Sequence, residues 1–541
     1  ILVCSAWPYG YSIPHLGNMM SSLLSGDVFS RFYKLRGYDT CYVSGTDMHG
    51  TRAEFEALKR GINVSSLLSN NHKMLSKLIK DFNIDFDNYT HTETDNHKEF
   101  VREIYMDMFE NGMISTKTEK RAFCENCQKF LADAFIEGSC PKCGFKNAKG
   151  NQCDQCSSLL EAEELDDSRC KICNGNSVIF RETKHWFIEL DKLEPKLKEY
   201  VASHPEWTGN VKNFTENLLK EGLKPRAITR DLEWGIKAPF EGADKKIIYV
   251  WGEAALGYVS ATKEIREDWQ DFWFGSDVKQ IYTQAKDNIV FHSILLPAIL
   301  LASEQDYHLP DQIAATEYLN WVGGKKFSKS MGVGVFMDDA LALMPVDHWR
   351  FYLLYDRPET KDTSFSWEEI DKTSNQVLIG DFGNFVNRTL MFLEKYFNLK
   401  IPEANLSDRD KDVLDEINKV EGLYRDAMEE GSIKGAVEAF VSLCRVGNIY
   451  FQQREPWKNE LDRDRTLYVC AQLTKAMAIF SYPLVPSIAK KLWGILNIDN
   501  EISWEELNKK INPGHVIKKP EILIEKVDIE AVKKKYEAMK K

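Results

Sequence analysis

No run of apolar residues in the chain is long enough to cross a membrane as a helix, so we expect no membrane-spanning segment. A basic leader with a small-residue cleavage site is also missing after Ile1, and we therefore expect a cytoplasmic protein. The sequence has no repeat period and no low-complexity tract, apart from a lysine-rich stretch from Lys533 that we interpret as a solvated helix end.

An excess of positive charge is lacking as well. The net charge of −12 argues against sequence-independent DNA binding, which depends on broad neutralisation of phosphates by Lys and Arg, although local basic patches could still hold a nucleic acid. The length of 541 residues predicts about three to four domains of ~100–200 residues each. Hydrophobic residues at 43% are sufficient for a core in each of them.

Cysteine is scarce outside one stretch of the chain. Cys4, Cys41, Cys444 and Cys470 are scattered, whereas the other eight of the 12 cysteines form four C-x-x-C pairs. These pairs are Cys124 with Cys127, Cys140 with Cys143, Cys153 with Cys156, and Cys170 with Cys173. Such clustering indicates metal sites rather than disulfides, because structural zinc takes four thiolates in a tetrahedron. Spacing along the chain, taken alone, favours the first two pairs as one site, since short loops close easily.

The N-terminal segment has the pattern of a β-α-β unit. Residues 1–6 read as a short buried strand, Ser12 is the expected N-cap of a helix that ends before Gly37, and residues 40–44 form a second strand. The loop 45–50 follows this strand directly. Because ligands bind at the carboxyl ends of strands in such folds, we expect both loops at a binding edge.

Three residues at the start of this helix stand out. His15, Gly17 and Asn18 lie in its first turn, where unpaired backbone N–H groups attract anions, so this turn would suit a polyphosphate. A simple capping turn is the alternative. A second candidate, Lys326 to Ser330, follows Gly323 and Gly324 and reads as a flexible lysine loop. By itself so short a motif carries little weight.

The remaining pattern predicts an insertion and a helical region. From about residue 116 to 183 the sequence is rich in turns and cysteines, and α/β character returns with residues 247–251 and 281–282. Ser366, in a capping box with Glu369, opens a run of amphipathic helices that continues to about Leu496, with caps at Ser407 and Ser432. We expect the following divisions: 1–115 and 226–325 as halves of an α/β domain, 116–225 as the insertion with cysteine knuckles at about 120–183, 326–365 as a linking module, 366–525 as a helical bundle, and 526–541 as a tail.

Together the two signatures, His15-Leu16-Gly17-Asn18 and Lys326-Phe327-Ser328-Lys329-Ser330, resemble the HIGH and KMSKS motifs of class I aminoacyl-tRNA synthetases. Further motifs resemble the methionyl-tRNA synthetase family, namely Ala6-Trp7-Pro8-Tyr9, the loop 47–51, Trp251 with Gly257 and Tyr258, residues 286–288 with Phe291 and His292, and the four cysteine pairs. The sequence departs from the family at Asn18, Trp7, Gly252, Glu253, Ala255 and Phe327. An Asn still donates a hydrogen bond to phosphate, so the first departure is compatible with the chemistry.

The resemblance implies a Rossmann-like domain split by a zinc-knuckle insertion, an α-helical anticodon-binding domain, and activation of methionine with ATP and Mg²⁺ before transfer to tRNA. It implies catalytic roles for His15, Asn18, Lys326, Lys329 and Arg230, with ATP held by His15, Gly17, Asn18, Lys329 and Ser330. Gly17 would leave room for the flat adenine, and a surface pair with Asp231 is the alternative for Arg230. The methionine site would comprise Ala6, Trp7, Asp47, Trp251, Tyr258, Phe291 and His292, each aromatic among them being plain core in the alternative interpretation. The anticodon would be read by Asn384, Arg388 and Trp457, and a solvated helix pair is the alternative for the first two.

For the cysteines the resemblance implies a nested arrangement. One zinc would be held by Cys140, Cys143, Cys153 and Cys156, and a second by Cys124, Cys127, Cys170 and Cys173. We further expect a monomer. Rival interpretations are a cysteinyl-tRNA synthetase, a nucleotidylyltransferase of the same superfold, and a zinc-ribbon RNA-binding protein without catalysis.

Overall fold

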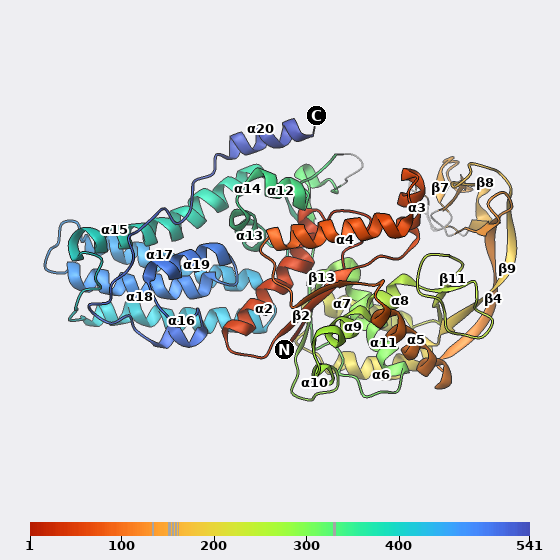
Figure 1. Cartoon of the computed structure of the whole chain (residues 1–541), viewed down its shortest axis with the longest axis horizontal. Coiled ribbons are helices and arrows are strands. Elements are labelled where there is room, and N and C mark those ends of the chain that lie inside the picture. The colour runs from red at the N-terminus through yellow and green to blue at the C-terminus, as the bar shows by residue number, and fades with distance from the viewer. Residues whose placement is uncertain are drawn as a thin grey trace.

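A parallel β-sheet, built from two separate stretches of the chain, forms the centre of the N-terminal half of the protein (Figure 1). The computed structural model describes residues 1–131, 135–149, 153, 156, 160, 162–327 and 332–540. The strands are β1 (Leu2–Ser5), β2 (Cys41–Thr46), β3 (Asn88–His91), β13 (Gln280–Ala285) and β14 (Gln312–Thr316). Their order is β14-β13-β1-β2-β3, and every neighbouring pair is parallel. The predicted fold class, α/β with a parallel sheet, is confirmed.

Helices cover both faces of this sheet. On one face, α2 (Ser25–Leu35) packs against β1, β2 and β13, and on the other, α9 (Gly257–Ile265) packs against β2 and β3. Outer helices of this half are α3 (Thr51–Arg60), α4 (Val64–Asp81), α5 (Asp95–Glu110), α6 (Leu190–Ala202), α7 (Gly209–Glu221), α10 (Trp269–Trp273) and α11 (Leu296–Ala302). The chain goes from β1 to β2 and β3 on one side and later to β13 and β14 on the other. This reversal opens a crevice at the carboxyl ends of β1 and β13.

The first helix begins later than expected. His15, not Ser12, is the N-cap of α1 (Leu16–Met19): its Nδ1 accepts hydrogen bonds from the backbone N–H groups of Gly17 and Asn18, over 3.1 and 3.3 Å. The prediction of Ser12 was wrong because Pro14 disfavours helical geometry at the residue before it. A π-helical turn, η1 (Met20–Leu24), joins α1 to α2.

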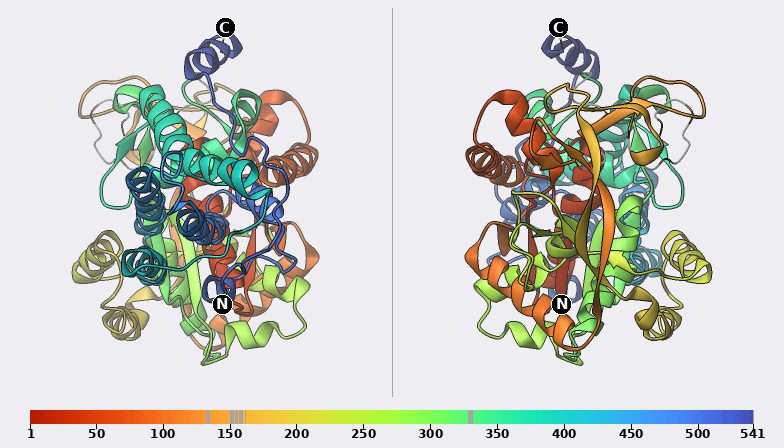
Figure 2. Two further views of the ribbon diagram at one scale, coloured as in Figure 1. Left: turned by 90° about the vertical axis from the view of Figure 1, so that its left-hand side faces the viewer. Right: turned by 90° about the vertical axis from the view of Figure 1, so that its right-hand side faces the viewer.

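The insertion is a long antiparallel ribbon that carries the cysteines at its far end (Figure 2, right). Strand β4 (Ile114–Cys124) pairs along its whole length with β9 (Val178–Ile188). Shorter strands complete it: β5 (Lys129–Phe130), β6 (Ile136–Ser139), β7 (Ala148–Lys149), β8 (Asp166–Cys170) and β10 (Arg226–Ala227), with the turn η3 (Ala162–Glu164).

After the ribbon the chain returns to the sheet, and α/β character returns with residues 247–251 as expected. Ile247 and Ile248 form β12, which pairs with β11 (Thr229–Arg230) outside the central sheet. The following residues form the helix α8 (Val250–Ala254), which places Trp251 in the lining of the crevice.

A helical bundle forms the C-terminal half (Figure 1, left). Its helices are α14 (Trp367–Asp371), η7 (Lys372–Gly383), α15 (Asn384–Phe397), α16 (Asp408–Glu429), α17 (Ile433–Arg454), α18 (Arg463–Ser481) and α19 (Pro486–Leu496), followed by η8 (Trp504–Asn508). Ser407 forms a capping box with Asp410, and Ser432 caps α17. Ser366 caps α14, but the Glu369 side chain contacts Lys372, so only half of the expected box is made. Among the described residues, every helix is too short or too polar to span a membrane.

The C-terminal segment folds back over the region between the two halves (Figure 1, top). This region contains the short strands β15 (Leu319–Asn320) and β16 (Thr363–Ser364) and the helices α12 (Met337–Leu343) and α13 (Val346–Tyr355). Helix α20 (Ile529–Met539) packs on α12 and α14, with Val532 and Tyr536 buried. The expectation of a solvated helix end holds only for the lysine-bearing face, because the apolar residues of α20 form the other face.

A buried ion pair joins the sheet domain to the bundle. The Arg350 guanidinium in α13 donates to Asp27 in α2 over 2.6 Å, and both side chains are 0% exposed. The same guanidinium donates to the carbonyl of Leu484, which precedes α19. Burial opposes ionisation of Asp27, but the charges of Arg31 and Arg350 outweigh it, so the pKa of Asp27 lies below its ordinary value.

We expect Asp27→Asn to lower the free energy of unfolding by about 3–5 kcal/mol, because it leaves buried guanidinium groups without a counter-charge. Urea unfolding followed by circular dichroism measures the change. The control is Asp81→Asn, which breaks the exposed pair of Lys77 and Asp81 and should cost less than about 1 kcal/mol. Equal, small losses in both variants would contradict the assigned role.

Candidate active site

The crevice at the carboxyl ends of β1 and β13 is a pocket of about 450 Å³. All seven residues predicted for the amino-acid site line it: Ala6, Trp7, Asp47, Trp251, Tyr258, Phe291 and His292. His15 and Asn18 line the same pocket, on the side of the α1 N-terminus. The structure therefore brings the predicted amino-acid residues and the first phosphate-binding signature together.

Trp7 forms one wall of this pocket, and two glycines make room for it. A Cβ at Gly45 or Gly257 would lie 2.3 or 2.5 Å from the Trp7 ring, closer than any side chain could approach. The ring also packs edge-on against Tyr258, with centroids 6.2 Å apart. The departure from the family at position 7 is thus accommodated by the absence of side chains on β2 and α9.

The opposite wall is aromatic and uncharged. Trp251 and Phe291 pack with ring centroids 4.6 Å apart. Nδ1 of His292 donates to the carbonyl of Asn288 over 3.1 Å, which leaves Nε2 to accept from the Tyr258 hydroxyl over 2.8 Å. Burial lowers the pKa of His292 to about 4, so its ring is neutral at pH 7. This wall suits an apolar or weakly polar side chain such as a thioether.

Asp47 is the charged group at the base of the pocket. It is 3% exposed, follows directly after β2, and accepts a hydrogen bond from the backbone N–H of His49 over 3.1 Å. Burial, followed by the negative charge of Glu253, raises the pKa of Asp47 to about 8. A buried carboxyl group with a raised pKa favours a cationic ligand, because a nearby positive charge stabilises the ionised form of the carboxyl group.

The α1 N-terminus presents hydrogen-bond donors to the pocket. His15 uses Nδ1 as the cap acceptor and burial lowers its pKa to about 4, so the ring is neutral and carries its proton on Nε2. Phe327 stacks on this ring with centroids 4.4 Å apart. A Cβ at Gly17 would lie 3.1 Å from the His15 ring and 3.3 Å from the carbonyl oxygen of Leu319, so packing also favours glycine there.

Two of the remaining catalytic candidates, Lys326 and Arg230, are not among the residues that line the pocket. Lys326 is exposed, and Lys329 and Ser330 lie outside the described residues. Arg230 donates to the carbonyls of Ala227 and Thr229, and its guanidinium lies 3.9 Å from the centroid of the Tyr249 ring. Asp231, the alternative partner of Arg230, is bonded to Lys246 and His185.

Several pocket residues escaped the sequence analysis. Tyr11, Arg52 and Phe336 line the pocket, and His49 and Glu253 form the charged cluster behind Asp47. His49, within the loop 47–51, and Arg52, directly after it, could have been suspected from these positions. Phe336 offered no signal, because it enters the pocket from the linking module through contacts distant in sequence.

The eight paired cysteines form two clusters. Cys124, Cys127, Cys170 and Cys173 make one, and Cys140, Cys143, Cys153 and Cys156 make the other, with the sulfurs in each within 4.8 Å of one another. Four of the separations are 3.6–3.9 Å. A tetrahedron with metal–sulfur bonds of ~2.3 Å has edges of about 3.8 Å, so the two thiol sets fit metal ions of this kind. The pairing along the chain is nested, not sequential.

In the bundle, two of the three anticodon candidates meet at one ring. The Arg388 guanidinium lies 4.2 Å from the centroid of the Phe451 ring. The Trp457 ring stacks on the same Phe451 ring, with centroids 6.1 Å apart. Asn384 is exposed one turn before Arg388 on α15. Nη2 of Arg388 is buried and has no hydrogen-bond partner among the described residues.

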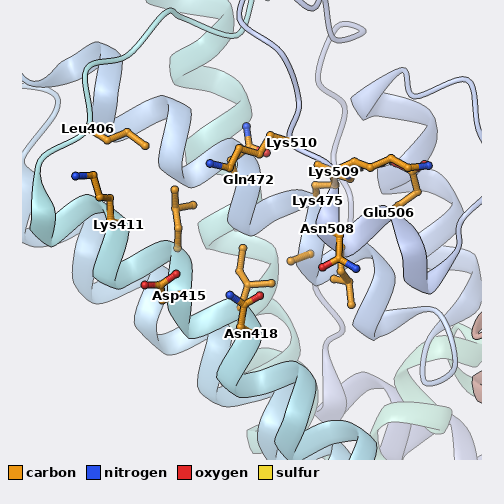
Figure 3. A pocket seen from close by; sticks show the side chains of 14 residues that line it. Leu406, Lys411, Asp415, Asn418, Gln472, Lys475, Glu506, Asn508, Lys509 and Lys510 are labelled. Carbon is orange, nitrogen blue, oxygen red and sulfur yellow. Dashed lines mark hydrogen bonds and ion pairs between the residues drawn. The ribbon is translucent and has the colours of Figure 1, made fainter.

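A second hollow, of about 460 Å³, lies between α16, α18 and η8 (Figure 3). Its rim carries Lys411, Lys509 and Lys510, while Lys475 is buried against Glu506 and the carbonyl of Lys509. None of the predicted anticodon residues lines it. Its buried polar groups are paired within the protein: Lys475 with Glu506, and Gln472 with the backbone of Ile511.

Comparisons with known proteins agree with both halves of the fold. Residues 1–390 match the family model for tRNA synthetases class I (M), and residues 401–540 match that for the anticodon binding domain of methionyl tRNA ligase. The methionine–tRNA ligase of Saccharolobus solfataricus is 42% identical, over 100% of this chain and 98% of its own length. That of Thermofilum pendens is 41% identical, over 98% and 96%.

A solved structure shows the same fold. Mycobacterium tuberculosis methionyl-tRNA synthetase bound by methionyl-adenylate superimposes with a TM-score of 0.81 at 23% identity, over 97% of this chain and 99% of that one. The sheet, the crevice and the bundle thus define a class I tRNA synthetase. Within that class, the chain belongs to the methionine–tRNA ligase family.

Proposed function

We propose that the protein activates L-methionine with ATP to methionyl-adenylate and then transfers methionine to the 3′ end of methionine tRNA. The observation that carries the proposal is the single pocket that places Asp47 and the aromatic wall beside His15 and Asn18. A cysteinyl-tRNA synthetase is not favoured, since its family uses a zinc in the amino-acid pocket and no cysteine lines this pocket among the described residues.

In the first step, the methionine carboxylate attacks the α-phosphorus of ATP, an oxygen–phosphorus bond forms, and pyrophosphate leaves. Such a transfer depends mainly on positioning and on stabilisation of negative charge. The Nε2–H of His15, the Asn18 amide and the α1 N-terminus supply donors for the phosphates. Lys326, Lys329 and Ser330 of the lysine loop, with Arg230, add positive charge and donors in this proposal.

Recognition of methionine divides between one charge and one neutral wall. Asp47 pairs with the α-ammonium group, while Trp7, Trp251, Phe291 and the Tyr258–His292 pair enclose the thioether side chain. A neutral His292 matters here, because a charged ring would favour an acidic side chain over a thioether. In the second step, the terminal ribose hydroxyl of the tRNA attacks the activated carbonyl, and AMP leaves.

The proposal includes two metals. Mg²⁺ bound to ATP would neutralise part of the charge of its phosphates. Zinc is the ion that suits two closed sets of four thiolates, and each set would fold its own segment of the insertion. We assign anticodon recognition to Asn384, Arg388 and Trp457, where Nη2 of Arg388 is a buried donor without a hydrogen-bond partner among the described residues.

Exchange of pyrophosphate into ATP should depend on methionine among the standard amino acids, and Asp47→Asn should abolish most of it. Methionine affinity, measured by calorimetry, should fall by up to about tenfold per pH unit below pH 8. The sign follows from the raised pKa of Asp47, since a protonated carboxyl cannot pair with an ammonium group. Exchange with cysteine but not methionine would refute the proposed function.

We expect two zinc ions per chain, and the double variant Cys153→Ser with Cys156→Ser should lose one of them. The cluster of Cys124 should keep its metal, because its four sulfurs do not include the altered positions. Atomic absorption gives the zinc count, and thiol reagents report which cysteines become reactive. Cys444→Ser, at a scattered cysteine, is the control; labelling of Cys170 and Cys173 in the double variant would contradict the nested arrangement.

Trp457→Ala should weaken charging of tRNA by an amount comparable with one base stack, ~1–3 kcal/mol, while leaving methionine-dependent exchange intact. Trp457→Phe keeps an aromatic face and should restore most of the charging. Aminoacylation and exchange rates, measured on the same preparations, separate the two effects. A parallel loss of both reactions would make Trp457 a structural residue.

A further inference from the structure

A charged cluster that the proposed chemistry does not use lies directly behind Asp47. His49 is 2% exposed and contacts two carboxylates: Nδ1 lies 2.6 Å from Glu253, and Nε2 lies 2.5 Å from Glu93. Glu253, which is completely buried in α8, also accepts from Nε2 of His97 in α5 over 3.1 Å. The cluster connects the loop after β2 to α8, which carries Trp251, and to α5, which carries His97. The His97 ring in turn stacks against Trp7.

The contacts fix the charge of His49. Ionised carboxylates only accept hydrogen bonds, so both ring nitrogens must donate, and the ring is an imidazolium. Burial alone would lower its pKa, but the charges of Glu253 and Glu93 raise the pKa of His49 to about 10. The same contacts keep the pKa of Glu253 below its ordinary value despite burial.

Within the hydrogen-bonded cluster, carboxylates outnumber cations. Asp47, Glu93 and Glu253 are three carboxylates, and His49 with Lys98, which pairs with Glu93 over 3.0 Å, supplies two cations. The other ionisable groups that face the cluster or the pocket side of Asp47 are Tyr9 and Tyr11 after β1, Arg52 in α3, Tyr105 in α5, Arg230 in β11 and Asp287 after β13. The Arg52 side chain bonds to Tyr11, and the Arg230 guanidinium lies over the Tyr249 ring. Among the described residues, Asp47 therefore forms an ion pair with no cation, and it faces the pocket.

We propose that His49 is a positioning residue for the amino-acid site: as a fixed imidazolium it neutralises Glu253, so that Asp47 is the carboxylate of this cluster that remains to pair with the α-ammonium group of the substrate. This inference rests on the proposed function, and it specifies how the site recognises the α-ammonium group of its substrate. The backbone N–H of His49 also donates to Asp47, so one residue orients that carboxylate and sets the charge behind it.

Removal of the imidazolium has a defined consequence. Without it, Glu253 and Asp47 are two buried carboxylates with too little positive charge between them, and like charges at short range cannot both ionise. The proton that one of them must bind reduces the fraction of Asp47 ready for an ammonium group. Removal of Glu253 has the opposite effect, because the imidazolium then favours ionisation of Asp47.

The test compares His49→Gln, Glu253→Gln and the double variant. Methionine affinity and KM are measured from pH 6 to 9, beside the KM for ATP. His49→Gln should weaken methionine binding at least tenfold at pH 7. The acid limb, which is the part of the profile where affinity falls as the pH is lowered, should move to higher pH. In Glu253→Gln the acid limb should move to lower pH, and the double variant should recover most of the affinity lost in His49→Gln. The KM for ATP should change less than twofold throughout.

His72→Gln is the matched control. This histidine bonds to Thr46, one residue before Asp47, and within the described part of the chain it has no carboxylate partner, so its variant should keep the unmodified pH profile. A methionine analogue without the α-amino group should bind the unmodified protein and His49→Gln equally. Shifts in the same direction for His49→Gln and Glu253→Gln, or none, would overturn the proposal.

If His49→Gln fails to fold, Glu253→Gln alone decides, and an unshifted acid limb refutes the inference. Failure of the proposed function itself is distinguishable, because then the unmodified protein would show no methionine-dependent exchange. If the unmodified protein exchanges methionine and the charge variants have no effect on its pH profile, only the role of His49 is wrong.

Discussion

The contact between Asp27 and Arg350 fixes how the two halves of the protein are joined. One carboxylate in α2 holds guanidinium groups from its own helix and from α13, and Arg350 continues to the carbonyl before α19. Helix α2 also packs on the strands whose ends form the crevice. The position of the bundle relative to the pocket therefore depends on a charge pair that is costly to separate, because both side chains are completely buried. In the proposed function, a tRNA that contacts both halves would therefore bind to two surfaces whose relative position is fixed.

The crevice separates its electrostatic tasks by depth. In the proposed function, donors at the α1 N-terminus would bind the phosphates and the neutral wall would enclose the side chain, while the charged cluster lies behind Asp47. Burial would ordinarily suppress charge in such a place. Here Glu93 and Glu253 are paired with His49 and Lys98, so Asp47 is the carboxylate of the cluster that remains for a ligand. In the proposed function, selectivity for an amino acid with an uncharged side chain depends on this arrangement as well as on shape.

Much of the fold and pocket could be predicted because the signals were local or motif-based. The β-α-β unit, Asp47 at a strand end and the caps at Ser407 and Ser432 depend on neighbours in the chain. His49 and Glu253 meet across 204 positions, and no periodicity predicts that contact. Pro14 moved the helix start to His15, a local effect that the hydrophobic pattern concealed. The cysteine pairing likewise required knowledge of relatives, since loop entropy alone favoured sequential pairs.

The ribbon of β4 and β9 leaves the sheet domain and returns to it at adjacent residues, Ile114 and Ile188. Because these two residues are paired, the sheet domain would have the same geometry if a short turn joined them in place of the whole insertion. The inner cysteine cluster enters the outer one in the same way, between Cys127 and Cys170. Since loop closure becomes only slowly more costly with length, segments can be gained or lost at such points without disturbing the crevice. The insertion can therefore change in length or in number of metal sites during evolution independently of the sheet domain.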